Sequence, residues 1–227
     1  MSVAIIIPAL DEEGALPQVL RDIPPSLAAT VVVVDNGSSD RTAEVARQGG
    51  AVVLREEQRG YGAACQAGVA ALPDDIEIVV FMDADGSDAP EEAAALIEPL
   101  RLGEADLALG SRELGRAEAG ALNVHQRLGN RLAVGLMRLF FGRRFTDLGP
   151  FRAIRADRLA ELGMRDPNYG WTIEMQIKAV RQGLRIVELP VSCRRRRGGS
   201  SKVSGNPWGS VAAGAKILWT VAKFAWT

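Results

Sequence analysis

Short apolar runs alternate with helix-like segments through the first 110 residues of this chain, and this alternation constrains the fold most. The runs are rich in β-branched side chains, as expected of strands buried on both faces of a parallel sheet, and they lie at 3–7, 31–34, 51–54, 76–82 and 106–109. The segments between them predict helices at 16–21, 42–48, 61–72 and 90–100. We expect Pro8 to end the first strand. Such alternation builds an α/β fold with a mostly parallel, Rossmann-like central sheet and helices on both faces.

Polar clusters follow four of these runs, at 11–13, 35–37, 59–62 and 83–85. Ligands of open parallel sheets bind beyond the carboxyl ends of the strands, so we expect all four clusters along one edge. Asp83 and Asp85, two residues apart at a strand end, can both face a hard divalent cation. Asp35 and Glu12 are candidates to hydrogen-bond a base or a ribose.

The pattern changes after residue 110. We expect a loop over 111–126, a Gly-Pro turn and a strand within 146–154, a helix at 171–182, a strand at 184–189, a further short strand at 192–197 and a last helix at 208–226. The segment 127–141 reads as an amphipathic helix, with leucines at helical spacing at 128, 132, 136 and 139. We therefore divide the chain into a first half at 1–110, a second half of the same domain at 111–205, and a C-terminal helix at 206–227 that could lie on a membrane surface, cover the sheet or contact another copy.

Charge is distributed unequally between the two halves. Residues 1–110 hold 20 acidic and 6 basic residues, a net of −14, whereas residues 111–227 hold 8 acidic and 21 basic residues, a net of +13. The acidic half could hold a cation, and the basic half could hold phosphate, nucleic acid or an anionic membrane. Two cysteines without a C-x-x-C spacing exclude a disulfide framework and fit a reducing, cytoplasmic compartment. We expect no signal peptide and no transmembrane helix.

Six motifs in register resemble the family 2 glycosyltransferases of the GT-A fold. They are PALDEE at 8–13, VDNGSSD at 34–40, GYGAA at 60–64, DAD at 83–85, TDLGPFR at 146–152 and RRRGGSSK at 195–202. The last two are similar to the dolichol-phosphate mannose synthase-like, or polyprenyl-phosphate glycosyltransferase, branch. The resemblance covers about residues 3–204. It implies that 1–110 is a nucleotide-sugar and metal-binding half and that 111–205 is an acceptor-binding half of the same domain.

The resemblance implies a metal-dependent, inverting transfer of a hexose from a GDP- or UDP-linked sugar to a polyprenyl phosphate. It implies donor-binding roles for Pro8, Glu12, Asp35, Gly60, Asp83, Ala84, Asp85 and Arg112, with Asp83 and Asp85 as ligands of Mg²⁺ or Mn²⁺. Arg152, Arg197, Ser200, Ser201 and Lys202 would hold the acceptor or phosphates. Asp147, Glu174 and Arg152 are the candidate catalytic residues, with Asp147 or Glu174 as the base if the acceptor is a hydroxyl. Asn36 departs from the family, where a second Asp is common at that position.

Alternative interpretations keep the donor but use a soluble hydroxyl acceptor, or assign the chain to the sugar-nucleotide nucleotidyltransferases, or make it a nucleic-acid-binding module based on the arginine cluster. The loop after the first strand holds 11–13, three acidic residues, rather than the Gly-rich basic loop of nucleotidyltransferases. As partners we expect the nucleotide sugar and an anionic lipid phosphate, no nucleic acid, and leave open peripheral contact with the cytoplasmic face of the membrane and a homo-oligomer.

Overall fold

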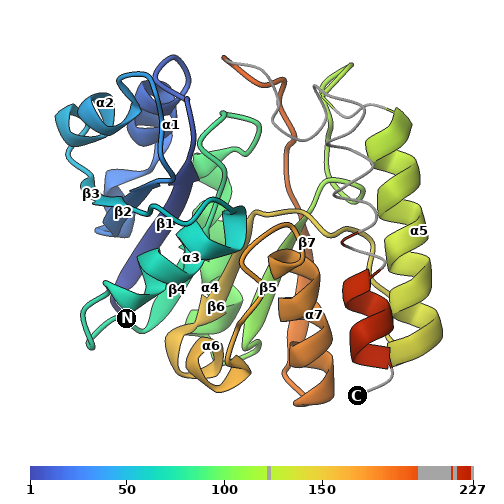
Figure 1. The fold of residues 1–227 in the computed structure, drawn as a ribbon. Coiled ribbons are helices and arrows are strands. Elements are labelled where there is room, and N and C mark those ends of the chain that lie inside the picture. The colour runs from blue at the N-terminus through green and yellow to red at the C-terminus, as the bar shows by residue number, and fades with distance from the viewer. Residues whose placement is uncertain (122–123, 199–215, 217–218, 226–227) are drawn as a thin grey trace.

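A seven-stranded sheet with the strand order β3-β2-β1-β4-β6-β5-β7 organises the described part of the chain (Figure 1). It is seen in a computed structural model that describes residues 1–121, 124–198, 216 and 219–225. The strands are β1 (Val3–Ala9), β2 (Thr30–Asp35), β3 (Val52–Arg55), β4 (Ile78–Phe81), β5 (Leu107–Ser111), β6 (Arg152–Arg155) and β7 (Ile186–Pro190). All neighbouring pairs are parallel except those of β6, which runs antiparallel to both β4 and β5. The predicted α/β fold with a mostly parallel sheet is confirmed.

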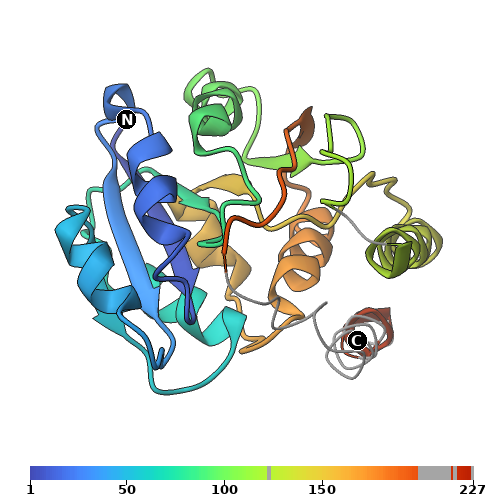
Figure 2. The ribbon, with the colours of Figure 1, turned by 90° about the horizontal axis from the view of Figure 1, so that it is seen from above.

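Helices cover both faces of this sheet (Figures 1 and 2). They are α1 (Leu16–Asp22), α2 (Thr42–Gln48), α3 (Tyr61–Ala70), α4 (Ala93–Arg101), α5 (Val124–Phe141), α6 (Ala156–Leu162) and α7 (Trp171–Arg181), with single 3-10 turns at Pro25–Leu27 and Pro90–Glu92. One core cluster joins α1, α2 and α4 to one face of the sheet. A second cluster joins α3, α5, α6 and α7 to the other face, and Val221 of the C-terminal helical residues packs into it. None of the helices in the described ranges has both the length and the apolar character needed to span a bilayer.

The central strand β1 shows why the sheet is buried on both faces. Val3, Ile5 and Ile7 belong to the first core cluster, whereas Ala4 and Ile6 belong to the second. Successive side chains of a strand point to opposite faces, so a continuous apolar run fits only where both faces are covered. The run of apolar residues read from the sequence is the direct signature of this position.

The first strand continues through Pro8, where we expected it to end. Pairing of β1 with β4 stops at Ile6 and Phe81, but pairing with β2 continues to Ala9 and Asp35. The Ile6 carbonyl accepts a bond from the β4 side, so position 8 faces the same side beyond the end of that ladder. The missing proline N–H therefore removes no ladder hydrogen bond.

The expected strand at 192–197 is wrong, because this segment forms only a single bridge, between Cys193 and Ala117. Its backbone bonds elsewhere: the Arg194 N–H donates to the carbonyl of Ser87, and the Arg197 N–H donates to the carbonyl of Asp85. The segment thus lies across the turn that follows β4, which places arginines beside aspartates.

The leucines of α5 also differ from expectation. The spacing suggested that the residues at 128, 132, 136 and 139 form the packing face, yet Leu128, Leu132 and Leu139 are exposed. Ala133 and Met137 are buried instead. Leu136 does pack against the second core cluster, so the expectation holds for this leucine and fails for the other three.

Candidate active site

Glu12 and Asp35 are held in place by bonds between the loops that follow β1 and β2. The Glu12 N–H donates to Oγ1 of Thr42 at 2.8 Å, and Oδ1 of Asp35 accepts the N–H of Ser38 at 2.8 Å. Asp11 adopts a left-handed backbone conformation with φ of 53°, and its Oδ1 accepts the N–H of Ser39 at 2.8 Å. Glu12 and Asp35 are both buried and lie at one edge of the sheet. The expected grouping of the loops after β1 and β2 is therefore present.

Asn36, the departure from the family pattern, fastens this edge to the loop before α3. Its Nδ2 donates to the carbonyls of Glu56 and Gln58 at 3.1 and 2.7 Å, and its Oδ1 accepts the N–H of Gly60 at 2.7 Å. A carboxylate could accept the last bond but could not donate the first two. The amide is therefore required by this geometry.

The glycines at 60 and 62 admit the backbone of a distant loop. A Cβ on Gly60 would lie 2.1 Å from the carbonyl oxygen of Pro167, and one on Gly62 would lie 2.0 Å from that of Asp166. Gly60 also has φ of 140°, which favours glycine. Close approach of the 166–168 loop thus accounts for both residues, and the Gly60 N–H is already used by Asn36.

Glu174 organises that same loop from the first turn of α7. Its carboxylate accepts the N–H groups of Arg165 and Asp166 at 3.1 and 2.7 Å, and Nζ of Lys178 lies 2.7 Å from Oε1. The Glu174 side chain is buried, and Lys178 is partly exposed, so these hydrogen bonds form where water has little access to the carboxylate. The sequence offered Glu174 as a base, and the structure places it in the support of the loop that packs on α3.

Three aspartates crowd the turn after β4. The Asp83 N–H donates to Oδ2 of Asp88 at 2.9 Å, and Oδ1 of Asp85 accepts the N–H of Ser87 at 2.8 Å. Burial, together with the charges of Asp88 and Asp85, raises the pKa of Asp83 well above its usual range. Burial likewise raises the pKa of Asp88 to about 7. Neighbouring carboxylates of this kind suit a divalent cation, which would offset their repulsion.

The arginine segment brings a cation to these carboxylates. Nη1 of Arg196 lies 3.1 Å from Oδ2 of Asp85, and Nη2 of the same guanidinium contacts Oε1 of Glu12. One guanidinium therefore joins the candidate nucleoside contact to the candidate metal ligand. Arg197 lies beside this turn through its backbone bond to Asp85. Ser200, Ser201 and Lys202 lie outside the described residues. Within the described part of the chain, no group of three or more His, Cys, Asp or Glu residues is arranged so that it could hold a metal ion.

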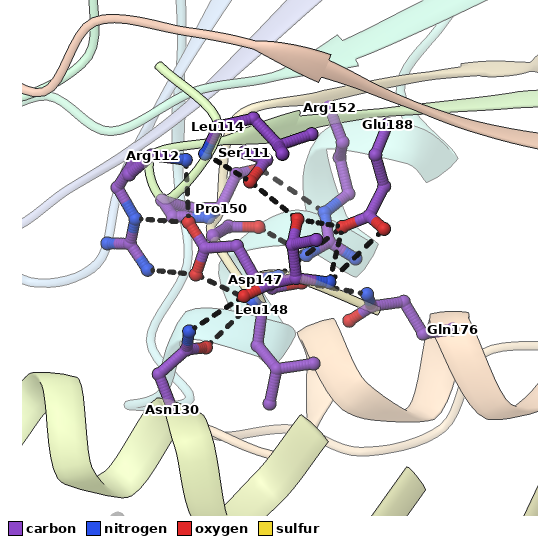
Figure 3. Close-up of polar contacts among 12 residues, drawn as sticks. Ser111, Arg112, Leu114, Asn130, Asp147, Leu148, Pro150, Arg152, Gln176 and Glu188 are labelled. Carbon is purple, nitrogen blue, oxygen red and sulfur yellow. Dashed lines mark hydrogen bonds and ion pairs between the residues drawn. The ribbon is translucent and has the colours of Figure 1, made fainter. Parts of the chain in front are cut away.

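Asp147 and Arg112 form a second buried centre, shown in Figure 3. The two carboxylate oxygens accept bonds from Nε and Nη2 of Arg112 at 2.7 and 2.8 Å, and from its backbone N–H at 2.9 Å. Asp147 is only 2% exposed. Burial lowers the pKa of Arg112, but the bonds and charge of Asp147 outweigh it and leave that pKa raised. Arg112 is also among the charges that lower the pKa of Asp83, so this pair adjoins the aspartate turn.

Sequence reasoning missed the residues that hold the Asp147 loop. Oε1 of Glu188 accepts the N–H groups of Thr146 and Asp147, Nε2 of Gln176 donates to the Asp147 carbonyl, and Asn130 bonds the backbone of Thr146 and Leu148 (Figure 3). A signal existed: Glu188 is the lone charge in the apolar run of β7, and Gln176 lies among apolar residues of α7. Lone polar residues in buried elements are usually bonded to something specific.

Arg152 lies in the interior beneath this loop. Its guanidinium donates to the carbonyls of Pro150 and Thr172 at 3.3 and 2.9 Å, and also to that of Gly149. Burial lowers the pKa of Arg152 to about 10. In this structure the Arg152 guanidinium bonds to backbone carbonyls inside the protein and is not exposed at the surface, where a phosphate would bind.

Comparison with known proteins identifies the family. The sequence model of glycosyl transferase family 2 matches residues 4–163. An uncharacterized glycosyltransferase of Mycobacterium tuberculosis is 39% identical over 216 residues, which are 93% of this chain and 94% of that protein. The undecaprenyl-phosphate mannosyltransferase of Micrococcus luteus is 33% identical, with 90% of this chain and 88% of that protein covered. The polyprenol monophosphomannose synthase of Mycolicibacterium smegmatis is 30% identical, with 89% and 81% covered.

Solved structures agree on the fold. Glucosyl-3-phosphoglycerate synthase of Mycobacterium tuberculosis, in complex with Mn²⁺, UDP and glucosyl-3-phosphoglycerate, superposes with a TM-score of 0.79 at 24% identity. The match covers 99% of this chain and 80% of that chain. On the family match, the relatives and the shared fold, this chain belongs to the family 2 glycosyltransferases.

Proposed function

We propose that this glycosyltransferase moves a hexose from a GDP- or UDP-linked sugar to a polyprenyl phosphate. The observation that carries the proposal is the placement of the 194–197 segment across the aspartate turn, with Arg196 between Asp85 and Glu12. A carboxylate cluster for a metal and a donor thereby meets a cluster of cations for phosphates. The names of the Micrococcus and Mycolicibacterium relatives support a polyprenyl phosphate acceptor and favour mannose as the hexose.

The donor would bind at the edge formed by β1, β2 and β4. We assign the nucleoside to Pro8, Glu12 and Asp35 and the sugar side to Arg112, with Gly60 and Ala84 in the surrounding loops. Asp83 and Asp85 would hold Mg²⁺ or Mn²⁺, whose remaining ligands would come from the donor diphosphate. When bound, the metal supplies positive charge to the leaving nucleoside diphosphate.

The choice of acceptor depends on whether a carboxylate is available to act as a general base. An oxygen of the lipid phosphate attacks the anomeric carbon, a new C–O bond forms, and the bond to the nucleoside diphosphate breaks with inversion. A phosphate oxygen is already anionic and requires no base. Both carboxylates that the sequence offers as a base, Asp147 and Glu174, are buried and hold other groups. We therefore propose positioning roles for them, with Asp147 orienting Arg112.

Cations are needed instead, because acceptor and donor phosphates repel each other. We assign this part to Arg197 and to the loop residues Ser200, Ser201 and Lys202. Arg152 would act from beneath, by fixing the carbonyls of the 149–150 loop. The net charge of +13 in the second half of the chain fits such a task.

The test is transfer of radiolabelled sugar from GDP- and UDP-linked donors to undecaprenyl phosphate, beside a panel of soluble alcohols. We expect a labelled lipid product that depends on Mg²⁺ or Mn²⁺. Asp85→Asn should abolish the transfer while the circular dichroism spectrum still reports a folded protein, whereas Asp74→Asn, on an exposed turn, should leave the transfer intact. Transfer to the alcohols alone would overturn the lipid acceptor, and full activity of Asp85→Asn would overturn the metal assignment.

A further inference from the structure

Helix α5 has two apolar faces, and among the residues that the structure describes only one of these faces is packed. Met137 belongs to the second core cluster, Leu136 packs against it, and Ala133 is buried beside them. Leu128, Leu132 and Leu139 are 57, 54 and 72% exposed on the other side. At 100° per residue, these leucines and Gly135 fall within a narrow stripe that runs along the helix. We call Leu128, Leu132 and Leu139 the outer leucine row.

A row of arginines lies alongside the outer leucine row. Arg127, Arg131 and Arg138 are exposed, and they make no ion pair with any residue in the described ranges. Arg131 and Arg138 directly precede Leu132 and Leu139, and in both pairs the two members are seven residues apart. The arginines and the leucines therefore form two neighbouring rows along the helix. The sequence of α5 contains no acidic residue. This face therefore combines apolar side chains with uncompensated positive charge.

We propose that the outer leucine row and its arginines dock on an anionic membrane surface. Amphipathic helices that lie in the membrane interface have this make-up, with leucines that enter the acyl boundary and cations that meet lipid phosphates. Charge decides against a second copy as the occupant, because a two-fold contact would bring together two identical faces that carry arginines and offer no acidic side chain to pair with them. An anionic bilayer instead complements both rows at once.

The position of α5 links this surface to the site. Nδ2 of Asn130, on the inward side of the helix, donates to the carbonyl of Thr146, and its Oδ1 accepts the N–H of Leu148. These two residues flank Asp147, which holds Arg112. Docking would therefore bring the loop around Asp147 to the level of the lipid headgroups. This last consequence rests on the proposed acceptor, whereas the docking itself does not.

The test is co-sedimentation of the whole protein with vesicles, carried out without donor or acceptor. We expect binding to phosphatidylcholine vesicles that contain phosphatidylglycerol and little binding to phosphatidylcholine alone. The Leu132→Asp/Leu139→Asp double variant should lose about tenfold or more in partition coefficient. Arg131→Gln/Arg138→Gln should lose about fivefold for each arginine, and the loss should shrink as salt rises.

Leu102→Asp and Arg101→Gln, at the exposed end of α4, are the matched controls and should bind like wild type. Circular dichroism checks that each variant is folded. Transfer to a short-chain, water-soluble polyprenyl phosphate analogue should be unchanged in the leucine variant, which separates docking from catalysis. Equal binding to neutral and anionic vesicles, or equal loss in the controls, would overturn the proposal. So would a wild-type dimer in sedimentation velocity that the leucine variant abolishes, because the face would then join two copies.

Discussion

Replacement of Arg196 by glutamine should strengthen binding of Mn²⁺ to the nucleotide-free enzyme. In this structure Nη1 of Arg196 lies 3.1 Å from Oδ2 of Asp85, the proposed metal ligand. The Arg196 side chain is 23% exposed and that of Asp85 is 15% exposed. A metal that takes this carboxylate must first break a charge-assisted bond worth about 1.5–3 kcal/mol. The free-energy cost of breaking this bond should lie at the lower end of that range, because water reaches the partly exposed pair and because Arg196 keeps its contact with Glu12. We expect a Kd for Mn²⁺ about tenfold lower, which corresponds to ~1.4 kcal/mol.

Isothermal titration of Mn²⁺ into the apoprotein measures this change directly and does not depend on turnover. Arg195→Gln removes the same charge one residue away, where the side chain bonds the carbonyl of Ala119 and the backbone N–H meets Glu118. It should leave the Kd for Mn²⁺ close to that of wild type. Once UDP or GDP is present, Arg196 is free to serve the diphosphate, so the advantage of the glutamine variant should disappear. An unchanged Kd in Arg196→Gln, or an equal gain in both variants, would refute competition between the guanidinium and the metal.

Three further predictions concern stability. Asn36→Asp removes two donated bonds at a buried position and should lower the free energy of unfolding by about 2 kcal/mol in urea titration; an unchanged midpoint would contradict the role given to the amide. Asp147→Asn should lower the free energy of unfolding by about 3 kcal/mol, and the further change Arg112→Met should lower it little more, because the ion pair is already broken. Losses of stability that add up in the double-mutant cycle would count against a coupling between the two side chains. Bonds from Arg185 lower the pKa of Asp106 to about 2, so the contribution of the Asp106 carboxylate to the free energy of unfolding is present above pH 4 and is lost as pH falls from about 4 to about 2. The difference in stability between wild type and Asp106→Asn should vanish over that range, and a difference that persists at pH 2 would refute the role given to the carboxylate.

The edge of the sheet that we propose as the donor site could be predicted because the signals for it are local in the sequence. A run of β-branched residues predicts each buried strand, and the residues that follow such a strand lie at the carboxyl edge of a parallel sheet. The positions of Glu12, Asp35 and Asp85 followed from this rule alone. Asn36 was noticed only as a departure, because the two carbonyls that need its amide lie 20 and 22 residues away.

The second half of the chain resisted prediction because its contacts span long distances. Arg196 meets Glu12 across 184 residues, and no local pattern reports such a contact. The outer leucine row shows a different limit, since periodicity reveals that a face is apolar but not what covers it. The resemblance implied a phosphate-binding role for Arg152, and no local pattern reported that this side chain of β6 donates to the backbone carbonyl of Thr172, 20 residues away.

The reversed direction of β6 sets how an enzyme of this design could change its substrate. The parallel strands end at the edge that we propose as the donor site, but β6 begins there. The loop that leads into β6, around 146–151, therefore reaches this edge from the opposite direction. Insertions or deletions in that entry loop would remodel the acceptor side and leave β1, β2 and β4 in register. Selectivity for one acceptor over another can thus diverge while recognition of the nucleotide sugar is inherited unchanged.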